Sequence, residues 1–201
     1  MKLLRIVLVL VFLASISTSV QVKADPSGLY ITEGVLPYDI NFSSSPTGVT
    51  QRLFLSSETG LGYIIGDWFY IGGIFNYTAV NEQTTDSSGI INHQETFQYY
   101  GPSIGYMSDS WYILAHYFAN AEKKDSISGA ASANYDNTGN GFGVSLGYKF
   151  PIGGIEMAPV ISFKSITYTN CSANNGASGT CNPTQQQTEF DPYFTFLFNF
   201  K

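Results

Sequence analysis

The sequence predicts an all-β fold, an eight-stranded antiparallel up-and-down transmembrane β-barrel. Apolar residues alternate with small or polar ones along most of the chain, and a period of two is typical of strands. The connections between these runs are alternately short and long, as in barrels with tight turns on one side of a membrane and loops on the other. The composition combines 15% aromatic with only 12% charged residues, about half the charged share of a typical soluble domain.

Eight runs carry the alternation, at 28–42, 50–65, 68–80, 94–107, 111–123, 138–150, 155–169 and 188–200. Each is long enough to cross a bilayer, because a tilted strand needs about 9–11 residues. Pro37, Pro102, Pro159 and Pro192 lie inside runs, and we expect a bulge or a strand end at each, since proline cannot donate a ladder hydrogen bond.

The connections predict which ends of the strands lie on which side. Tight turns fall at 66–67, 108–110 and 151–154, and polar loops rich in Gly, Ser, Asn and Thr at 43–49, 81–93, 124–137 and 170–187. An even number of strands places both ends of the barrel domain on the side of the tight turns, which is the periplasmic side of such barrels.

The two faces of the runs differ in character. In 138–150, Phe142, Val144 and Leu146 share one face, and Gly143 and Ser145 lie on the other. The ring-rich face suits lipid, and the small-residue face suits a narrow lumen. A soluble lipocalin-like binder, with its apolar face turned inwards, is the alternative that this pattern leaves open.

Charged and titratable residues also fall on the small-residue face. Those predicted to face the lumen are Arg52, Glu58, His116, Glu122, Lys149, Glu156 and Lys164. We interpret them as ion pairs within a packed interior, because an eight-stranded barrel encloses little more than its own side chains. A narrow polar path or gate is the alternative.

The first 24 residues predict a secretory signal peptide. Lys2 and Arg5 precede an apolar run at 6–14, and the stretch ends in small residues before Asp25. The domains are therefore predicted as a signal peptide at 1–24 and one barrel domain at 25–201. The net charge is −6 before three basic residues leave with the signal, and such an acidic chain is not expected to bind nucleic acid.

The two cysteines, Cys171 and Cys181, are predicted to form a disulfide, because an exported protein meets an oxidising compartment. No cofactor and no metal site is predicted. Two cysteines without a nearby histidine are too few ligands, and Asp86 and Asp125 lack the spacing of a calcium loop, so we interpret them as solvated charges.

The last run ends in alternating aromatics, Phe196, Phe198 and Phe200. With this ending, the chain resembles the small eight-stranded outer-membrane β-barrel families of Gram-negative bacteria, such as the OmpX/Ail and OmpW groups. The resemblance implies a place in the bacterial outer membrane, contact with its lipid, and assembly by machinery that reads the three phenylalanines. Two departures are Lys201 after the last Phe and the absence of the Gly often found earlier in this signal.

Enzymatic activity is not predicted. Lipid A deacylases of this architecture use a His-x-Ser pair, but Tyr117 and Phe118 follow His116. Asp86, Ser87 and His93 could imitate the triad of a palmitoyltransferase barrel, and we interpret His93 as a solvated loop residue.

The sequence thus predicts a monomeric, non-enzymatic surface or envelope protein. Its loops would serve adhesion or bind a host surface or a small molecule, with the loop at 170–187 as the first candidate. A narrow pore or a conduit for small hydrophobic molecules is the alternative.

Overall fold

The computed structural model describes residues 28–40, 49–86, 89–129, 133–173 and 178–200, so the predicted signal peptide lies outside the described residues. The strands in this part of the chain are β1 (Gly28–Ile40), β2 (Val49–Ile65), β3 (Phe69–Asp86), β4 (Gly89–Met107), β5 (Trp111–Ser128), β6 (Ala133–Tyr148), β7 (Phe150–Ile152), β8 (Ile155–Ala173) and β9 (Ser178–Phe200). The described residues contain no helix that is long and apolar enough to cross a membrane.

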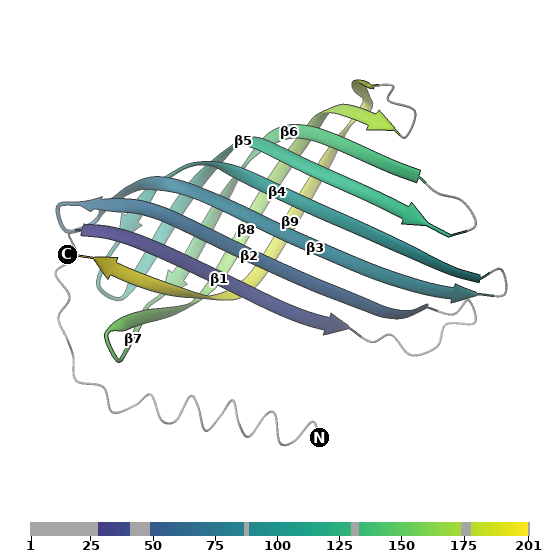
Figure 1. The fold of residues 1–201 in the computed structure, drawn as a ribbon. Coiled ribbons are helices and arrows are strands. Elements are labelled where there is room, and N and C mark those ends of the chain that lie inside the picture. The colour runs from purple at the N-terminus through teal and green to yellow at the C-terminus, as the bar shows by residue number, and fades with distance from the viewer. Residues whose placement is uncertain (1–27, 41–48, 87–88, 130–132, 174–177, 201) are drawn as a thin grey trace, which may run out of the picture.

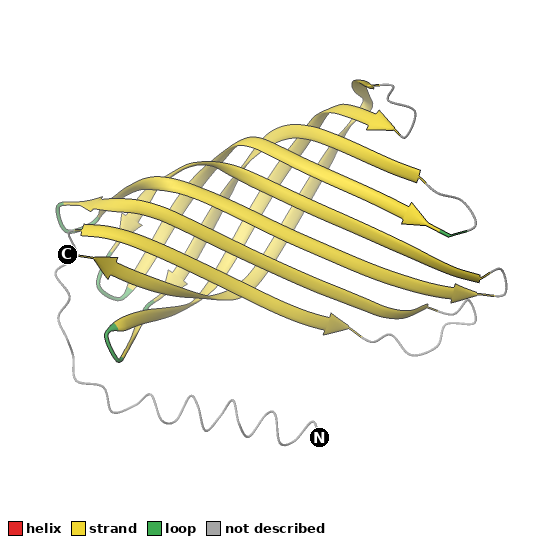
Figure 2. Cartoon of the chain, in the orientation of Figure 1, coloured by secondary structure: helices red, strands yellow, loops and turns green. Residues whose placement is uncertain are grey.

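The strands form one closed antiparallel sheet (Figures 1 and 2). Consecutive strands pair from β1 to β6, β6 pairs with β8 and β8 with β9. β1 pairs with β9, from Leu29↔Phe200 to Val35↔Phe194, to close the ring. β6 and β7 both pair with β8 and are separated only at Lys149, so they act as one strand. The predicted ring of eight strands is confirmed.

The strands are longer than predicted, and the long loops predicted at 81–93, 124–137 and 170–187 are wrong in extent. β3 and β4 stay paired as far as Asp86↔Gly89, and β8 and β9 as far as Ser172↔Ser178. The polar composition of these segments reflects their exposure to water rather than an absence of strands, because a polar residue such as threonine also favours strands. Most of 43–49 lies outside the described residues.

The apolar face of the strands points outwards, as predicted. On β6, Phe142, Val144 and Leu146 are exposed, whereas Gly143 and Ser145 are buried. The exposed apolar series runs from Phe142 to Phe150, and eight steps of about 3.3 Å along a strand tilted by about 40° span about 20 Å of depth. This height is close to the ~25 Å apolar band of a transmembrane barrel, so the outward face suits lipid and the inside-out arrangement of a lipocalin does not apply.

The interior is filled by two apolar layers. The layer towards the tight turns contains Tyr30, Tyr70 and Tyr112, and the layer towards the long hairpins contains Tyr99 and Phe118, among others. Inward glycines make room for these rings: a Cβ on Gly62 or Gly147 would overlap the ring of Tyr70 or of Tyr112. The small-residue face therefore accommodates large side chains from neighbouring strands rather than an open channel.

Bulges interrupt the alternation at defined places. Pro102 lies at a register shift between Tyr100 and Ser103, where a bulge was predicted. The same prediction is wrong for Pro37, Pro159 and Pro192, which lie inside continuous ladders. A second shift, between Phe118 and Ala121, changes which residues of β5 point inwards. Phe118 and Ala121 are both fully buried, so the even-numbered residues that follow lie on the outer face.

Candidate functional site

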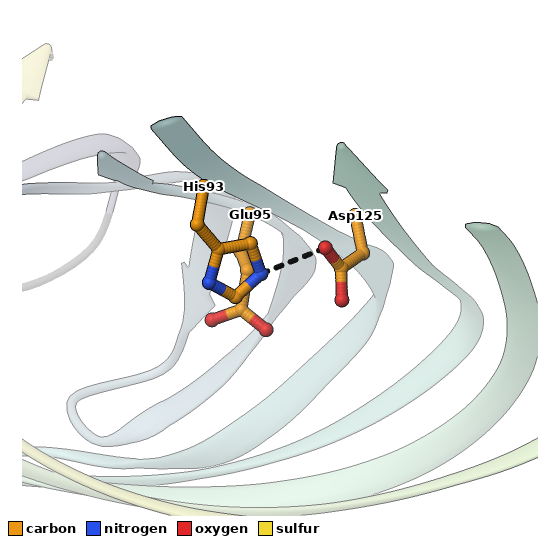
Figure 3. A group of neighbouring side chains, drawn as sticks. All are labelled: His93, Glu95 and Asp125. Atoms are coloured by element: carbon orange, nitrogen blue, oxygen red, sulfur yellow. Dashed lines mark hydrogen bonds and ion pairs between the residues drawn. The ribbon is translucent and has the colours of Figure 1, made fainter. Parts of the chain in front are cut away.

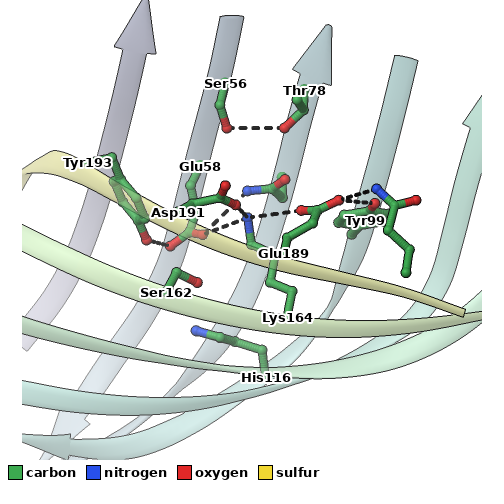
Figure 4. Close-up of polar contacts among 12 residues, drawn as sticks. Ser56, Glu58, Thr78, Tyr99, His116, Ser162, Lys164, Glu189, Asp191 and Tyr193 are labelled. Atoms are coloured by element: carbon green, nitrogen blue, oxygen red, sulfur yellow. Dashed lines mark hydrogen bonds and ion pairs between the residues drawn. The ribbon is translucent and has the colours of Figure 1, made fainter. Parts of the chain in front are cut away.

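A charged layer lies between the two apolar layers, centred on Lys164 of β8 (Figure 4). The Lys164 side chain is 1% exposed, and its Nζ lies 2.8 Å from Asp191 Oδ2, 3.8 Å from Glu189 Oε2 and 4.0 Å from Glu58 Oε2. One ammonium group therefore faces three carboxylates. A buried charge cluster of this kind is costly unless every member is compensated.

Three strands, β8, β9 and β2, supply these groups. Lys164 and Glu189 are direct partners in the β8–β9 ladder, and Asp191 follows two residues later on the same face of β9. Glu58 extends from β2 towards the same point. The layer thus joins parts of the ring that are not neighbours in the sheet, which closes the lumen at this level.

Hydrogen-bond donors compensate the excess of carboxylates. Tyr193 donates its hydroxyl to Glu58, and Asn76 Nδ2 donates to the same carboxylate at 3.4 Å. Tyr99 donates to Glu189 at 2.6 Å, and Gln187 Nε2 donates to it at 2.7 Å. Hydrogen bonds to a charged acceptor are about twice as strong as neutral ones, so these donors offset part of the cost of burying the carboxylates.

His116 belongs to a separate line of hydrogen bonds. Its Nδ1 lies 2.9 Å from Ser103 Oγ and its Nε2 lies 2.9 Å from Ser145 Oγ, which in turn donates to Ser162 at 3.1 Å. Its side chain is 3% exposed. The cavity beside it measures about 10 Å³, room for about one water molecule. A substrate therefore has no space at this histidine–serine contact.

The other residues predicted to face the lumen fall in different places. Lys149 is 5% exposed, and its Nζ lies 3.2 Å from Glu156 Oε2 near the tight turns. The side chain of Arg52 lies outside the described part of the chain. Glu122 departs from the prediction: the bulge in β5 turns it to the outer face, where it contacts Lys124 at 3.0 Å. The Glu122 carboxylate accepts this hydrogen bond and raises the pKa of Lys124.

A second polar cluster lies inside the mouth formed by the long hairpins (Figure 3). His93 and Glu95 project from β4 and Asp125 from β5, and His93 Nε2 lies 2.8 Å from Asp125 Oδ1. Lys123 Nζ lies 2.7 Å from Glu95 Oε1. The sequence alone places His93 and Asp125 on separate loops as solvated residues, so their contact was not predicted. The side chain of Asp86 and the whole of Ser87 lie outside the described residues.

The predicted disulfide between Cys171 and Cys181 is present. It crosses the β8–β9 hairpin, and Cys181 packs into the apolar layer with Phe118 and Tyr168. The predicted polar loop is therefore a paired hairpin tied to the barrel interior. Its tip, at 174–177, lies outside the described residues.

One carboxylate on the outer wall was not predicted. Glu33 of β1 lies opposite Thr59 of β2 and Phe196 of β9, and Thr59 Oγ1 donates to Glu33 Oε2 at 2.6 Å. Its neighbours on the same face of β1, such as Ile31, are apolar. The alternation along 28–42 could have predicted this outward position, because Glu33 is an even number of residues from Leu29 and Ile31 and so lies on the same face.

Comparisons with known proteins give structural similarity only. Neisserial surface protein A (NspA) superimposes with a TM-score of 0.46 and 16% identity over 87% of this chain and 98% of that one. The outer membrane protease OmpT from Escherichia coli gives a TM-score of 0.43 and 10% identity over 88% of this chain and 94% of that one. No protein-family model and no curated protein sequence matches the chain. Neither similarity assigns an activity to this chain.

Proposed function

We propose that the chain is a non-enzymatic protein of a bacterial outer membrane, in which a closed barrel holds long hairpins at the cell surface for contact with other molecules. The observation that carries the proposal is the filled lumen. Two apolar layers and the Lys164 layer occupy the interior, while an apolar exterior suits lipid. A filled barrel leaves its hairpins as the surface through which it acts.

The absence of enzymatic activity is part of this proposal. A nucleophile needs a base within hydrogen-bond reach and a place for its substrate. His116 meets the first condition through Ser103 and Ser145, but the neighbouring cavity of about 10 Å³ fails the second. The same contacts explain His116 as a structural residue that satisfies buried hydroxyl groups.

The hairpins offer a specific contact surface. A hollow of about 320 Å³ crosses β2 to β5 beyond the apolar band. Amide and hydroxyl side chains form most of its lining, on the outer face of the strands, namely Asn81, Gln83, Asn92, Gln94, Ser126 and Ser128. Such groups both donate and accept hydrogen bonds without charge, which suits a neutral, hydroxyl-rich ligand such as a sugar chain. The disulfide-closed hairpin of β8 and β9 is the second contact surface.

Location in the outer membrane and assembly there complete the proposal. Phe196, Phe198 and Phe200 would be read by the barrel assembly machinery, and outer-membrane lipid would surround the monomer. Fractionation and SDS gels of unheated and boiled samples test this. The protein should stay with the outer membrane and migrate differently in the two lanes, whereas a soluble protein with identical lanes would refute the proposal.

The contact role has its own experiment. Gln83→Ala with Gln94→Ala removes two amides from the hollow, and Gln98→Ala on β4 is a matched control outside its lining. Binding to an array of oligosaccharides should fall for the double variant alone. Shortening the hairpin between Cys171 and Cys181 tests the second surface in the same way, through loss of adhesion with the barrel still folded. Unchanged binding and adhesion in both experiments would contradict the contact role.

A narrow pore is the second candidate, because the middle layer is charged rather than apolar. Rearranged ion pairs could open a polar path through such a layer. Swelling of liposomes that contain the folded protein, in solutions of small sugars and amino acids, measures such permeation. The contact role predicts no swelling above that of empty liposomes.

A further inference from the structure

We propose that His93, Glu95 and Asp125 bind one divalent transition-metal ion, such as Zn²⁺, inside the mouth of the barrel. Each residue offers one ligand atom, and these atoms all lie within 4.8 Å of one another. The site is distinct from the Lys164 layer, and His93 is the one ligand that also lines the polar hollow described above.

The register of the sheet creates this arrangement. His93 and Glu95 are two residues apart on β4, so both side chains point to the same face. Asp125 is the direct ladder partner of Glu95 on β5. Figure 3 shows the three side chains converging from these two strands. Residues thirty or more positions apart in the chain thus meet without any loop rearrangement.

The distances fit a small cation. Zn²⁺ binds imidazole nitrogen and carboxylate oxygen at about 2.0–2.2 Å in tetrahedral geometry, which separates neighbouring ligand atoms by about 3.4 Å. The three atoms lie within 4.8 Å, and His93 Nε2 and Asp125 Oδ1 are 2.8 Å apart. Changes of side-chain rotamer can bring all three to the ion, which would then replace the direct hydrogen bond between His93 and Asp125.

The local charge also favours a cation. Glu95 and Asp125 face each other across the ladder, and like charges in that position destabilise a sheet. Glu82 of β3 is the ladder partner of His93 on the other side and adds a third carboxylate to this part of the wall. Lys123 neutralises only one of them, through Glu95. A divalent ion would relieve the remaining repulsion.

Lys123 competes with the metal ion for the carboxylate of Glu95 and can move away from it. Its Nζ contacts Glu95 Oε1 at 2.7 Å and also lies 5.3 Å from the centre of the Phe97 ring. The ring holds the ammonium group by a cation–π contact, so Lys123 keeps a partner when the metal takes Glu95. Removal of the lysine should therefore strengthen metal binding.

The ligand set indicates the class of metal. One imidazole nitrogen and two carboxylates suit Zn²⁺ and related transition metals, whereas Ca²⁺ and Mg²⁺ prefer oxygen ligands alone. The side chains of His93, Glu95 and Asp125 are 35%, 20% and 19% exposed, so an ion can enter from the surface. Three protein ligands leave at least one position open to water or to a further ligand.

The experiment is a titration of the untagged, folded full-length barrel domain in detergent with Zn²⁺ alone, followed by calorimetry. We expect one ion per chain, at least tenfold weaker binding by His93→Gln, Glu95→Gln and Asp125→Asn, and tighter binding by Lys123→Met. Glu122→Gln is the matched control, because it removes the same charge from the outer face of the same hairpin and should bind as the wild type does.

The difference between heated and unheated SDS gel lanes establishes that each variant is folded before it is titrated. Absence of Zn²⁺ binding by the folded wild type would overturn the proposal, as would Glu95→Gln binding like the wild type or Lys123→Met binding more weakly. Equal binding of Mg²⁺ would overturn the transition-metal assignment.

Discussion

The Lys164 layer and the His93 cluster are both carboxylate-rich sites on the inner wall, yet they are built differently. In the middle of the barrel, Lys164 is 1% exposed, and Glu58 and Glu189 near it also accept hydrogen bonds from Tyr193 and Tyr99. At the mouth, side chains are 19–35% exposed, and Lys123 neutralises only one carboxylate. Where water is excluded, the protein itself must supply the positive charge that balances the carboxylates. Where water enters, the solvent and its dissolved ions can screen them.

The largest expected effect comes from removing the built-in counter-charge. Lys164→Met leaves three carboxylates close together without a cation, and breaking a buried ion pair in this way costs about 3–5 kcal/mol. Urea unfolding of the barrel in lipid vesicles measures the loss. Lys124→Met, on the exposed outer face, should change the free energy of unfolding by less than about 0.5 kcal/mol. Equal losses in both variants would remove the distinction between buried and solvated charge.

The boundary between membrane and water can be located on a single strand. Val144→Arg places a charge in the outward apolar series of β6 and should cost about 2–4 kcal/mol if that position lies near the membrane midplane. Asn140 lies four residues away on the same exposed face, and Asn140→Arg should lower the free energy of unfolding by about 0–1 kcal/mol. The same unfolding assay compares them. A larger cost at Asn140 would place the mouth cluster inside the membrane and invalidate the comparison.

The disulfide ties the β8–β9 hairpin to the mouth. Replacing both Cys171 and Cys181 by serine should lower the free energy of unfolding by about 2–3 kcal/mol, the loop-closure term for a loop of this length. Limited proteolysis should cut the β8–β9 hairpin first, since the apolar band is protected. Cleavage that begins in the tight turns instead would contradict the idea that the disulfide stabilises the mouth.

The smallest effect is expected at the mouth cluster without metal. Asp125→Asn relieves its repulsion with Glu95 but loses the contact with His93, so the net change should stay within about 1 kcal/mol. Because the site is solvated, 1 M salt should reduce that change further. A change in the free energy of unfolding as large as that of Lys164→Met, and independent of salt, would show that water is excluded from the mouth cluster as it is from the Lys164 layer.

Much of the fold was predictable from the alternation of apolar and small residues, because in 138–150 and 188–200 this alternation predicts which side chains face lipid. Glu189 and Asp191 were missed, although they share the inward parity of Thr195 and Leu197. Their meeting with Glu58 depends on how the ring closes, which no single strand encodes. The prediction that Glu122 faces the lumen was wrong because the bulge after Phe118 exchanges the inward and outward positions of β5. The His93–Asp125 contact could not be predicted without the register between β4 and β5.

The most direct test of the central claim, a lumen closed by its own side chains, is single-channel recording of the folded wild-type barrel in planar bilayers. Insertion is verified independently by protease protection of the same protein in vesicles. We expect no conductance steps at either polarity, because two apolar layers and the Lys164 layer fill the interior. Stable, ohmic steps from the wild-type protein would contradict it and establish the pore.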